Sequence, residues 1–282
     1  TGVGIGVLGA LTSGDNNVAV GLDSLQANTT GSSNTAIGQT ALAANTTASE
    51  NTAVGMCAML ANTTGTTNVA VGFKSLNANT TGSSNTALGK DALCKNTTAS
   101  SNTSVGDATL KANTTGASNT AVGFGALFAN TTASHNIAIG RVALTANTTG
   151  TCNVAMGVNA LTANTTGNNN VAIGFCANAT AVDRNDNTAV GHEALKVNTA
   201  IGNTAVGKAA ADSNTSAEGI TAIGNRALCS NTTGANNTAV GLCAMRTSTT
   251  GPDNTSVGMC SLFANTTGCR NVAVGSCALD SN

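Results

Sequence analysis

The sequence predicts an all-β fold, a parallel β-solenoid or β-roll made of 17-residue coils, because one phrase returns along nearly the whole chain. The phrase is N-[TV]-A-[VIL]-G-x-x-A-L-x-x-N-T-T-G-x-x, and it begins, for example, at Asn34, Asn51, Asn68 and Asn85. Short apolar pieces that end in glycine and precede Asn-Thr-Thr-Gly are typical of strands separated by turns. Glycine and β-branched residues recur too often for a helix to persist.

The regular period indicates one elongated domain, residues 1–282, in which each coil contacts only its neighbours. We expect regular coils over 1–169 and again over 220–282. Between them, over 170–219, the pattern loosens: Asn178 stands in a leucine column, and one coil is a residue short. We interpret this stretch as irregular coils or a protruding loop.

Two columns of apolar residues are expected to form the core. Counting each coil from its first Asn, position 4 holds Val, Ile, Leu or Met, and position 9 is mostly Leu. The predicted core ladder comprises Val54, Val71, Val122 and Ile139 at position 4, with Leu76, Leu127, Leu144 and Leu161 at position 9.

The strand itself carries no charge on either side. Positions 2 and 4 share one face, and positions 3 and 5, Ala or Ser and Gly, share the other. Because a coil of 17 residues is too thin to bury both faces, we expect the small-residue face to meet copies of the same chain around an axis. The predicted self-association face is Ala53, Ala70, Ala87, Ala121 and Ala138.

The turn residues have structural roles of their own. Glycine at positions 5 and 15 fits left-handed or close-approach backbone sites. Asn at positions 1 and 12 favours turns, and stacked Asn side chains can form hydrogen-bonded ladders.

A cysteine column is the clearest covalent pattern among the nine cysteines. Cys243, Cys260 and Cys277 occupy position 7 of consecutive coils, where Cα atoms about 5 Å apart are within disulfide range. A Cys243–Cys260 or Cys260–Cys277 disulfide, bridges between chains, and free thiols that pack as small apolar side chains are the three alternatives.

The repeated Asn-Thr-Thr phrase also satisfies the N-glycosylation rule, and we expect its Asn residues in an exposed turn column. The alternative, which we favour, is that the phrase is simply good turn chemistry. The candidate sites are Asn28, Asn45, Asn62, Asn79, Asn96, Asn113, Asn130, Asn147, Asn164, Asn214, Asn231 and Asn265.

Several function classes have no support in the sequence. Charged residues make up 8% of the chain and the net charge is −1, so no basic surface is available for nucleic acid. No apolar run is long enough to span a membrane. His135 and His192 occupy different positions of distant coils without a partner nucleophile, and Asp183 and Asp186 lack calcium-loop spacing, so we expect no enzyme, cofactor or metal site.

The phrase N-T-A-[VI]-G-x-x-A-L resembles the head repeats of trimeric autotransporter adhesins, and the longer 17-residue unit resembles the repeat arrays of phage tail-fibre-like and bacterial surface proteins. The adhesin heads use a shorter period and a different turn. The resemblance implies a homotrimeric fibre of β-rolls, exposed outside a cell or on a virion. It also implies a structural or attachment role, with a cell-surface glycan or receptor as partner.

We therefore expect a non-enzymatic extracellular fibre segment that forms a homo-oligomer. One alternative is a protein whose flat, Thr-rich face binds an ordered surface such as ice or a polysaccharide. Another is a glycosylated filament subunit that polymerises end to end.

Overall fold

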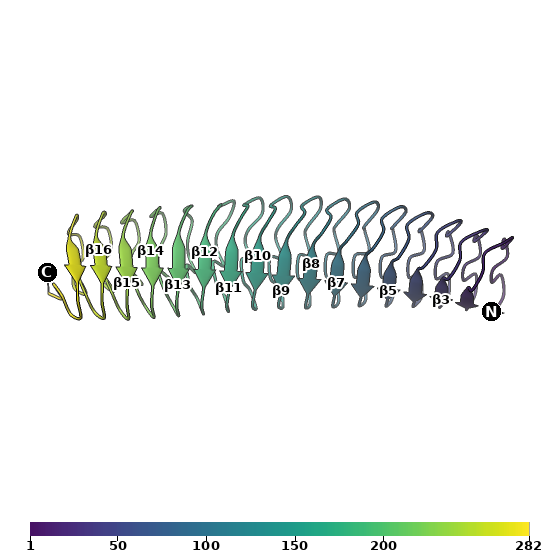
Figure 1. Cartoon of the computed structure of the whole chain (residues 1–282), viewed down its shortest axis with the longest axis horizontal. Coiled ribbons are helices and arrows are strands. Elements are labelled where there is room, and N and C mark those ends of the chain that lie inside the picture. Colours follow the sequence, from purple (N-terminus) through teal and green to yellow (C-terminus); the bar gives the residue numbers. More distant parts are fainter. Residues whose placement is uncertain (282) are drawn as a thin grey trace. The chain divides into compact units, whose positions relative to one another are not determined.

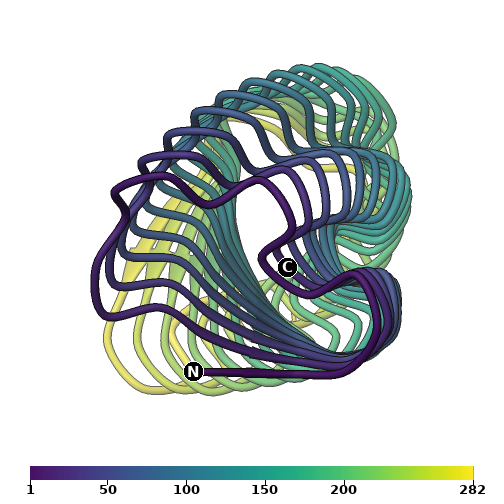
Figure 2. The ribbon, with the colours of Figure 1, turned by 90° about the vertical axis from the view of Figure 1, so that its right-hand side faces the viewer.

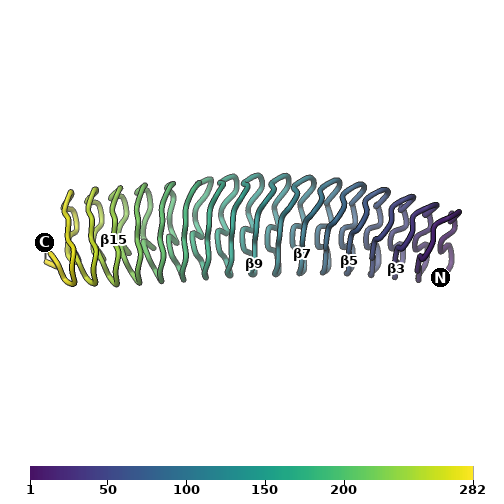
Figure 3. The backbone as a smooth tube through the Cα atoms, in the orientation of Figure 1, coloured from purple at the N-terminus to yellow at the C-terminus, as the bar shows by residue number. Residues whose placement is uncertain are grey.

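The computed structural model describes residues 1–281, and these form the predicted all-β parallel solenoid of about 16 turns of 17 residues, with no helix among them. The chain comprises two compact units, Thr1–Arg141 and Val142–Asn282. Figure 1 shows one short strand per coil, and Figure 3 shows the backbone path of each coil repeated by the next within a unit. That the two units act as one domain stays a prediction.

In the first unit, nine strands pair in parallel and in chain order. They are β1 (Gly2–Val3), β2 (Val18–Val20), β3 (Thr35–Ile37), β4 (Thr52–Val54), β5 (Val69–Val71), β6 (Thr86–Leu88), β7 (Thr103–Val105), β8 (Thr120–Val122) and β9 (Ile137–Ile139).

In the second unit, the described residues contribute eight parallel strands, again in chain order. They are β10 (Val154–Met156), β11 (Val171–Ile173), β12 (Thr188–Val190), β13 (Thr204–Val206), β14 (Thr221–Ile223), β15 (Thr238–Val240), β16 (Thr255–Val257) and β17 (Val272–Val274).

Figure 2 views the backbone along the coils, and the interior of a coil holds only a few side chains. In the coil that begins at Asn34, the buried side chains include those of Asn34, Ala36, Ala41, Leu42 and Asn45, at positions 1, 3, 8, 9 and 12. One leucine, two alanines and two asparagines thus fill most of the core cross-section. The predicted leucine column is confirmed: Leu76, Leu127, Leu144 and Leu161 are fully buried.

Hydrogen bonds join each coil to the next along almost its whole path. Gly38 N donates to Val20 O at 2.8 Å, and Leu42 N donates to Ala58 O at 3.0 Å. The predicted Asn ladders are also present, because Asn45 Nδ2 donates both to Asn28 Oδ1 at 2.8 Å and to Ala48 O at 3.0 Å. Backbone and buried amide groups therefore satisfy one another within the coil stack.

Each coil turns sharply at residues with positive φ. Gly38 at position 5 has φ +134°, and a Cβ added there would lie 2.6 Å from the carbonyl of Gly55 in the next coil, so the glycine is required. Leu42 at position 9 is also left-handed, with φ 51°. For a leucine this conformation is costly, and the burial of its side chain offsets the cost.

The structure places the two faces of the strand opposite to the prediction. Ala53, Ala70, Ala87, Ala121 and Ala138, expected to face other chains, point into the coil and are fully buried. The position 4 residues Val54, Val71, Val122 and Ile139, expected in the core, lie on the outer side and are partly exposed. The physical reason is space: with leucine and two asparagines already inside, only a small side chain fits at position 3.

The irregular stretch 170–219 remains within the coil path. Strands β11 to β14 pair without interruption, and the short coil is accommodated by pairing Thr188 with Thr204, an offset one residue smaller than usual. The stretch therefore continues as coils with one shortened step.

Candidate interaction surface

The outer side of the strands forms a regular surface on each unit. It is formed by the side chains at positions 2 and 4, which flank the buried Ala or Ser at position 3 and point away from the core. We call it the outer strand face. In the first unit it comprises Val18, Val20, Thr35, Ile37, Thr52, Val54, Val69, Val71, Thr86, Leu88, Thr103, Val105, Thr120, Val122, Ile137 and Ile139; in the second, the equivalent residues of β10 to β17.

This face is apolar and partly exposed to solvent. Ile37 is 41% exposed and Val71 is 38% exposed, and no residue of the face in β2 to β17 is charged. The hydroxyls on the face are those of threonines, which also carry a methyl group. Because strands lie about 4.8 Å apart and each residue advances about 3.3 Å, eight three-residue strands present a strip of roughly 400 Å². The largest apolar patch on a monomeric protein is typically about 300–600 Å² and is often functional, and this strip falls within that range.

The strands repeat in strict register along the face. Val54 pairs with Val71, and Thr103 pairs with Thr120, so each column keeps one side chain type or a close substitute at every step. A partner in contact with this face would therefore meet the same small group of atoms at intervals of about 4.8 Å.

A second exposed apolar feature lies at position 6, the corner that follows the recurrent glycine of each coil. Phe124 is 56% exposed, and Phe175 stacks on His192 of the next coil with ring centroids 5.2 Å apart. Other coils have Lys90 or Arg141 at the same position. This corner therefore carries aromatic side chains in some coils and basic ones in others, whereas the outer strand face is uncharged throughout. The corner was not among the predicted site residues, although phenylalanines spaced three coils apart were the signal that could have found it.

Ion pairs lie on the turns and away from the strands. Lys111 Nζ lies 3.2 Å from Asp91 Oδ2, and the hydrogen bond to this carboxylate raises the pKa of Lys111. Lys196 Nζ lies 2.7 Å from Glu193 Oε1, and this hydrogen bond lowers the pKa of Glu193 and raises that of Lys196. These pairs are partly exposed to solvent, and pairs of this kind contribute little to stability. They keep the turns polar while the outer strand face stays apolar.

The predicted glycosylation column is buried, so the expectation of an exposed turn is wrong. Each candidate Asn occupies position 12 and its side chain lies in the core, as Asn28 and Asn62 show, both fully buried. The Nδ2 atom that would carry the sugar donates to the neighbouring Asn and to the backbone. A glycan on this atom is incompatible with the folded coil. The other members are Asn45, Asn79, Asn96, Asn113, Asn130, Asn147, Asn164, Asn214, Asn231 and Asn265.

The cysteine column is present but unbridged. Cys243 and Cys260 are partly buried, Cys277 is exposed, and all three are free thiols in consecutive coils. The backbones pair here, since Cys260 N donates to Leu242 O at 2.9 Å and Cys277 N donates to Met259 O at 2.8 Å. Partial burial, reinforced by the two neighbouring thiols, raises the pKa of Cys260.

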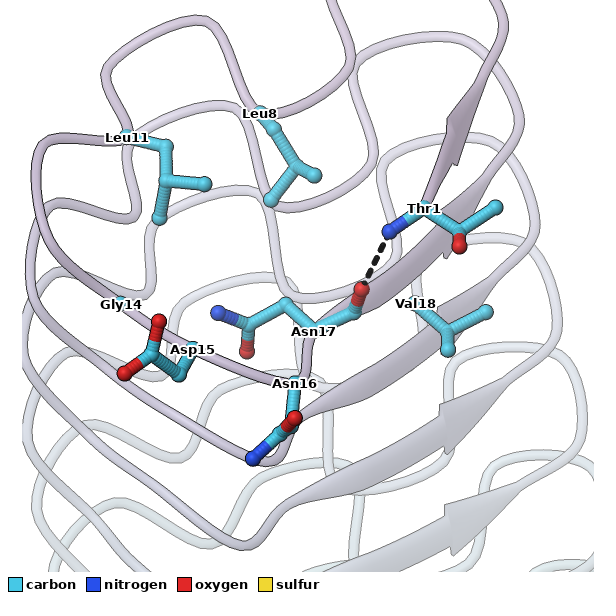
Figure 4. A pocket seen from close by; sticks show the side chains of 8 residues that line it. All are labelled: Thr1, Leu8, Leu11, Gly14, Asp15, Asn16, Asn17 and Val18. Carbon is cyan, nitrogen blue, oxygen red and sulfur yellow. Dashed lines mark hydrogen bonds between the residues drawn. The ribbon is translucent and has the colours of Figure 1, made fainter.

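A hollow of about 520 Å³ opens beside the first coil (Figure 4). Leu8, Leu11 and Asn17 line it, and the Thr1 amino group donates to Asn17 O at 2.8 Å. These are interior positions that a neighbouring turn covers elsewhere in the unit. Asp15 is the single ionisable side chain in its lining.

Within residues 1–281, no group of three or more His, Cys, Asp or Glu side chains is arranged to hold a metal ion. The same part of the chain has no helix that is long and apolar enough to cross a membrane. No protein-family model matches this chain, and no curated protein matches it.

Proposed function

We propose that this chain is a non-enzymatic structural or attachment segment of an extracellular fibre, and that copies of it associate, three around an axis, through the outer strand face. The observation that carries the proposal is the uncharged, partly exposed apolar strip at positions 2 and 4, maintained from β2 to β17. A strip of this kind gains stability when it is removed from water. A second copy is the economical partner, because it presents the same strip at the same spacing.

The mechanical role follows from the bonding pattern. Coils are joined by backbone hydrogen bonds, by the Asn ladders at positions 1 and 12, and by threonine hydroxyls such as that of Thr63, which donates to Thr80 O at 3.0 Å. Such a chain resists extension along the stack because many bonds must break together. Location outside a cell or on a virion, and attachment to a surface glycan or receptor, are parts of the proposal that the likeness of the repeat phrase to adhesin heads and tail-fibre arrays supports.

The proposal is tested by placing charge on the outer strand face. In the triple variant Ile37→Glu/Val54→Glu/Val71→Glu, three carboxylates occupy consecutive steps of one column. Burying them between copies would be costly, whereas in a free chain they remain in water. We expect the variant to keep the circular dichroism spectrum of the folded chain and to sediment as a monomer, while the unmodified chain sediments as a trimer.

The matched control places the same charges in the same region of the chain but outside the outer strand face. Thr47, Thr64 and Thr81 occupy position 14, in the turn, and are exposed. The variant Thr47→Glu/Thr64→Glu/Thr81→Glu should remain a trimer. If both variants and the unmodified chain sediment alike, association through the outer strand face is wrong.

A second function has its own supporting observation. The face presents Thr or Val beside Val or Ile at regular steps, as in Thr52 and Val54, which suits contact with an ordered surface such as ice or a polysaccharide. A chain that acts in this way would keep the face uncovered as a monomer. Inhibition of ice recrystallisation, or sedimentation with an insoluble polysaccharide, that is lost in the Ile37→Glu/Val54→Glu/Val71→Glu variant would favour this function over the fibre.

A further inference from the structure

The Asn column at position 12 works as a chain of donors and acceptors. In a regular coil the Nδ2 atom donates to the Oδ1 atom of the preceding coil, as Asn79 does to Asn62 at 2.8 Å and Asn96 does to Asn79 at 2.9 Å. In these coils the Oδ1 atom takes its donor from the following coil. Wherever the following coil lacks Asn, the preceding carbonyl oxygen loses that donor.

The coil that begins at Asn170 breaks this column. It has Ala181 at position 12, and Asn178 replaces leucine at position 9. Both residues are fully buried. The Oδ1 atom of Asn164 in the preceding coil has no hydrogen-bond partner within the protein, and neither has the Oδ1 or the Nδ2 atom of Asn178.

These three unpaired atoms belong to adjoining turns of the core. Asn164 Nδ2 is used, donating to Gly167 O at 3.0 Å, which leaves its Oδ1 atom for the next coil. Ala163 N donates to Ala179 O at 3.1 Å, so the backbone that carries Asn164 pairs with the backbone that carries Asn178 and Ala181. Ala181 lacks the carboxamide that fills this part of the core elsewhere.

A second break behaves in the same way. In the coil that begins at Asn237, position 12 is Ser248, which is fully buried. Its hydroxyl and the Oδ1 atom of Asn231 in the preceding coil are again unpaired within the protein. The orphaned acceptor thus accompanies loss of the following Asn, at two separate places.

We propose that the core beside Ala181 is an internal water-binding site, in which water accepts from Asn178 Nδ2 and donates to Asn164 Oδ1 and Asn178 Oδ1. Buried polar groups in native proteins are almost always paired with protein or with ordered water. A buried water needs two to four polar partners, and the unpaired atoms of Asn164 and Asn178 are one donor group and two acceptors on adjoining coils. The water takes the place of the absent side chain in the ladder.

A crystal structure of the unmodified chain, at a resolution that reveals ordered water, tests this site directly. We expect a water within hydrogen-bonding distance of Asn164 Oδ1 and of the Asn178 carboxamide. A dry site, or an Asn178 carboxamide bonded to protein groups instead, would overturn the proposal. This measurement needs no variant and does not depend on how copies of the chain associate.

Restoring the consensus should remove the water. In Asn178→Leu/Ala181→Asn the new carboxamide at position 181 donates to Asn164 Oδ1, and leucine fills the apolar site. We expect the water to be absent and Tm to rise by about 2–4 °C. The reverse exchange in a regular coil, Leu76→Asn/Asn79→Ala, should create a water site and lower Tm. Unchanged water density in the restored variant would contradict the assignment.

Discussion

The hydroxyls of Ser104 and Thr109 face each other across the interior of one coil, 2.5 Å apart, and both side chains are fully buried. They occupy positions 3 and 8, which hold alanine in most coils. The same pairing occurs between Ser256 and Ser261. In both coils with serine at position 3, position 8 also carries a hydroxyl, and each hydroxyl of the first pair lies 3.0 Å from a backbone acceptor as well, Ser104 Oγ from Thr109 O and Thr109 Oγ1 from Gly106 O.

This pair should show energetic coupling. Removing one hydroxyl in Ser104→Ala or Thr109→Val already breaks the bond between them, so the double variant should lose less than the sum of the single variants. We expect a coupling of about 0.5–1.5 kcal/mol in the free energy of unfolding, measured by urea denaturation. Ser75→Ala is the control, since the Ser75 hydroxyl donates to Gly72 O and position 3 of its coil is Ala70. Additive effects in the cycle would mean that the two hydroxyls do not interact.

Two substitutions in one coil separate the core from the outer strand face. Leu127 is fully buried, whereas Val122 is partly exposed on the outer side. Leu127→Asp buries a carboxylate in an apolar site and should abolish the folded circular dichroism spectrum of the coils around it. Val122→Asp should preserve that spectrum and weaken association instead. Loss of the folded spectrum in both variants would show that position 4 is a core position after all.

The buried Asn ladder should be a major source of stability. Asn45→Ala removes the donor to Asn28 Oδ1 and the acceptor of Asn62 Nδ2, and we expect a loss of about 2–4 kcal/mol in the free energy of unfolding. Thr47→Ala, in the same Asn-Thr-Thr phrase but exposed, should change it by less than about 0.5 kcal/mol. Equal effects of the two substitutions on the urea midpoint would contradict the prediction that the Asn ladder stabilises the fold.

The same burial predicts that the glycosylation phrases are unmodified in the folded protein. We expect the intact mass of chain secreted from glycosylating cells to equal the 27.2 kDa of the sequence. A folded, glycosylated chain would contradict the placement of Asn28 and its equivalents in the core. It would instead support the glycosylated filament subunit as the function.

Stability should fall in acid because of one carboxylate. The Thr165 and Thr166 hydroxyls, together with the Thr166 backbone N–H, donate to Asp183 Oδ1 and lower the pKa of Asp183. A depressed pKa in the folded chain stabilises it above the unfolded value of about 3.9, and this contribution disappears as pH falls through the folded value. Tm measured from pH 5 downward should therefore decline less in Asp183→Asn than in the unmodified chain, whereas parallel curves would exclude this role.

The cysteine column should form at most one disulfide. Cys260 lies between Cys243 and Cys277, so a bridge to one leaves the other as a thiol. Because its pKa is raised, Cys260 should react slowly with a low-molecular-weight disulfide at neutral pH, and faster as pH rises. Peptide mapping after oxidation should find Cys260 in any bridge of the column, and Cys260→Ser should prevent it. A Cys243–Cys277 bridge would contradict the stacking.

Much of the fold could be predicted because the period is visible in the residues. The glycine at position 5, the leucine column and the Asn ladders all follow from side chains that recur where geometry requires them, as at Gly38, Leu76 and Asn45. What could not be predicted was which face of each strand points into the core. Alternation distinguishes Ala53 from Val54 but, with both faces uncharged, does not indicate which is inside.

The deciding factor was the width of the coil. In the coil that begins at Asn51, the interior already holds the side chains of Asn51, Met59 and Asn62, all fully buried. Only the methyl group of Ala53 fits in the remaining space, and the larger Val54 is forced outward. The burial of Asn62 was not predicted because asparagine is usually exposed. Here the ladder supplies its carboxamide with hydrogen bonds, so the side chain can be buried.

The most direct test of the central claim is the mass of the native particle by light scattering under nonreducing conditions. If copies of the chain bury the outer strand face against one another, the particle should have three times the 27.2 kDa chain mass, independent of dilution over the working range. A monomer at every concentration would contradict association and would leave the face free for an ordered surface.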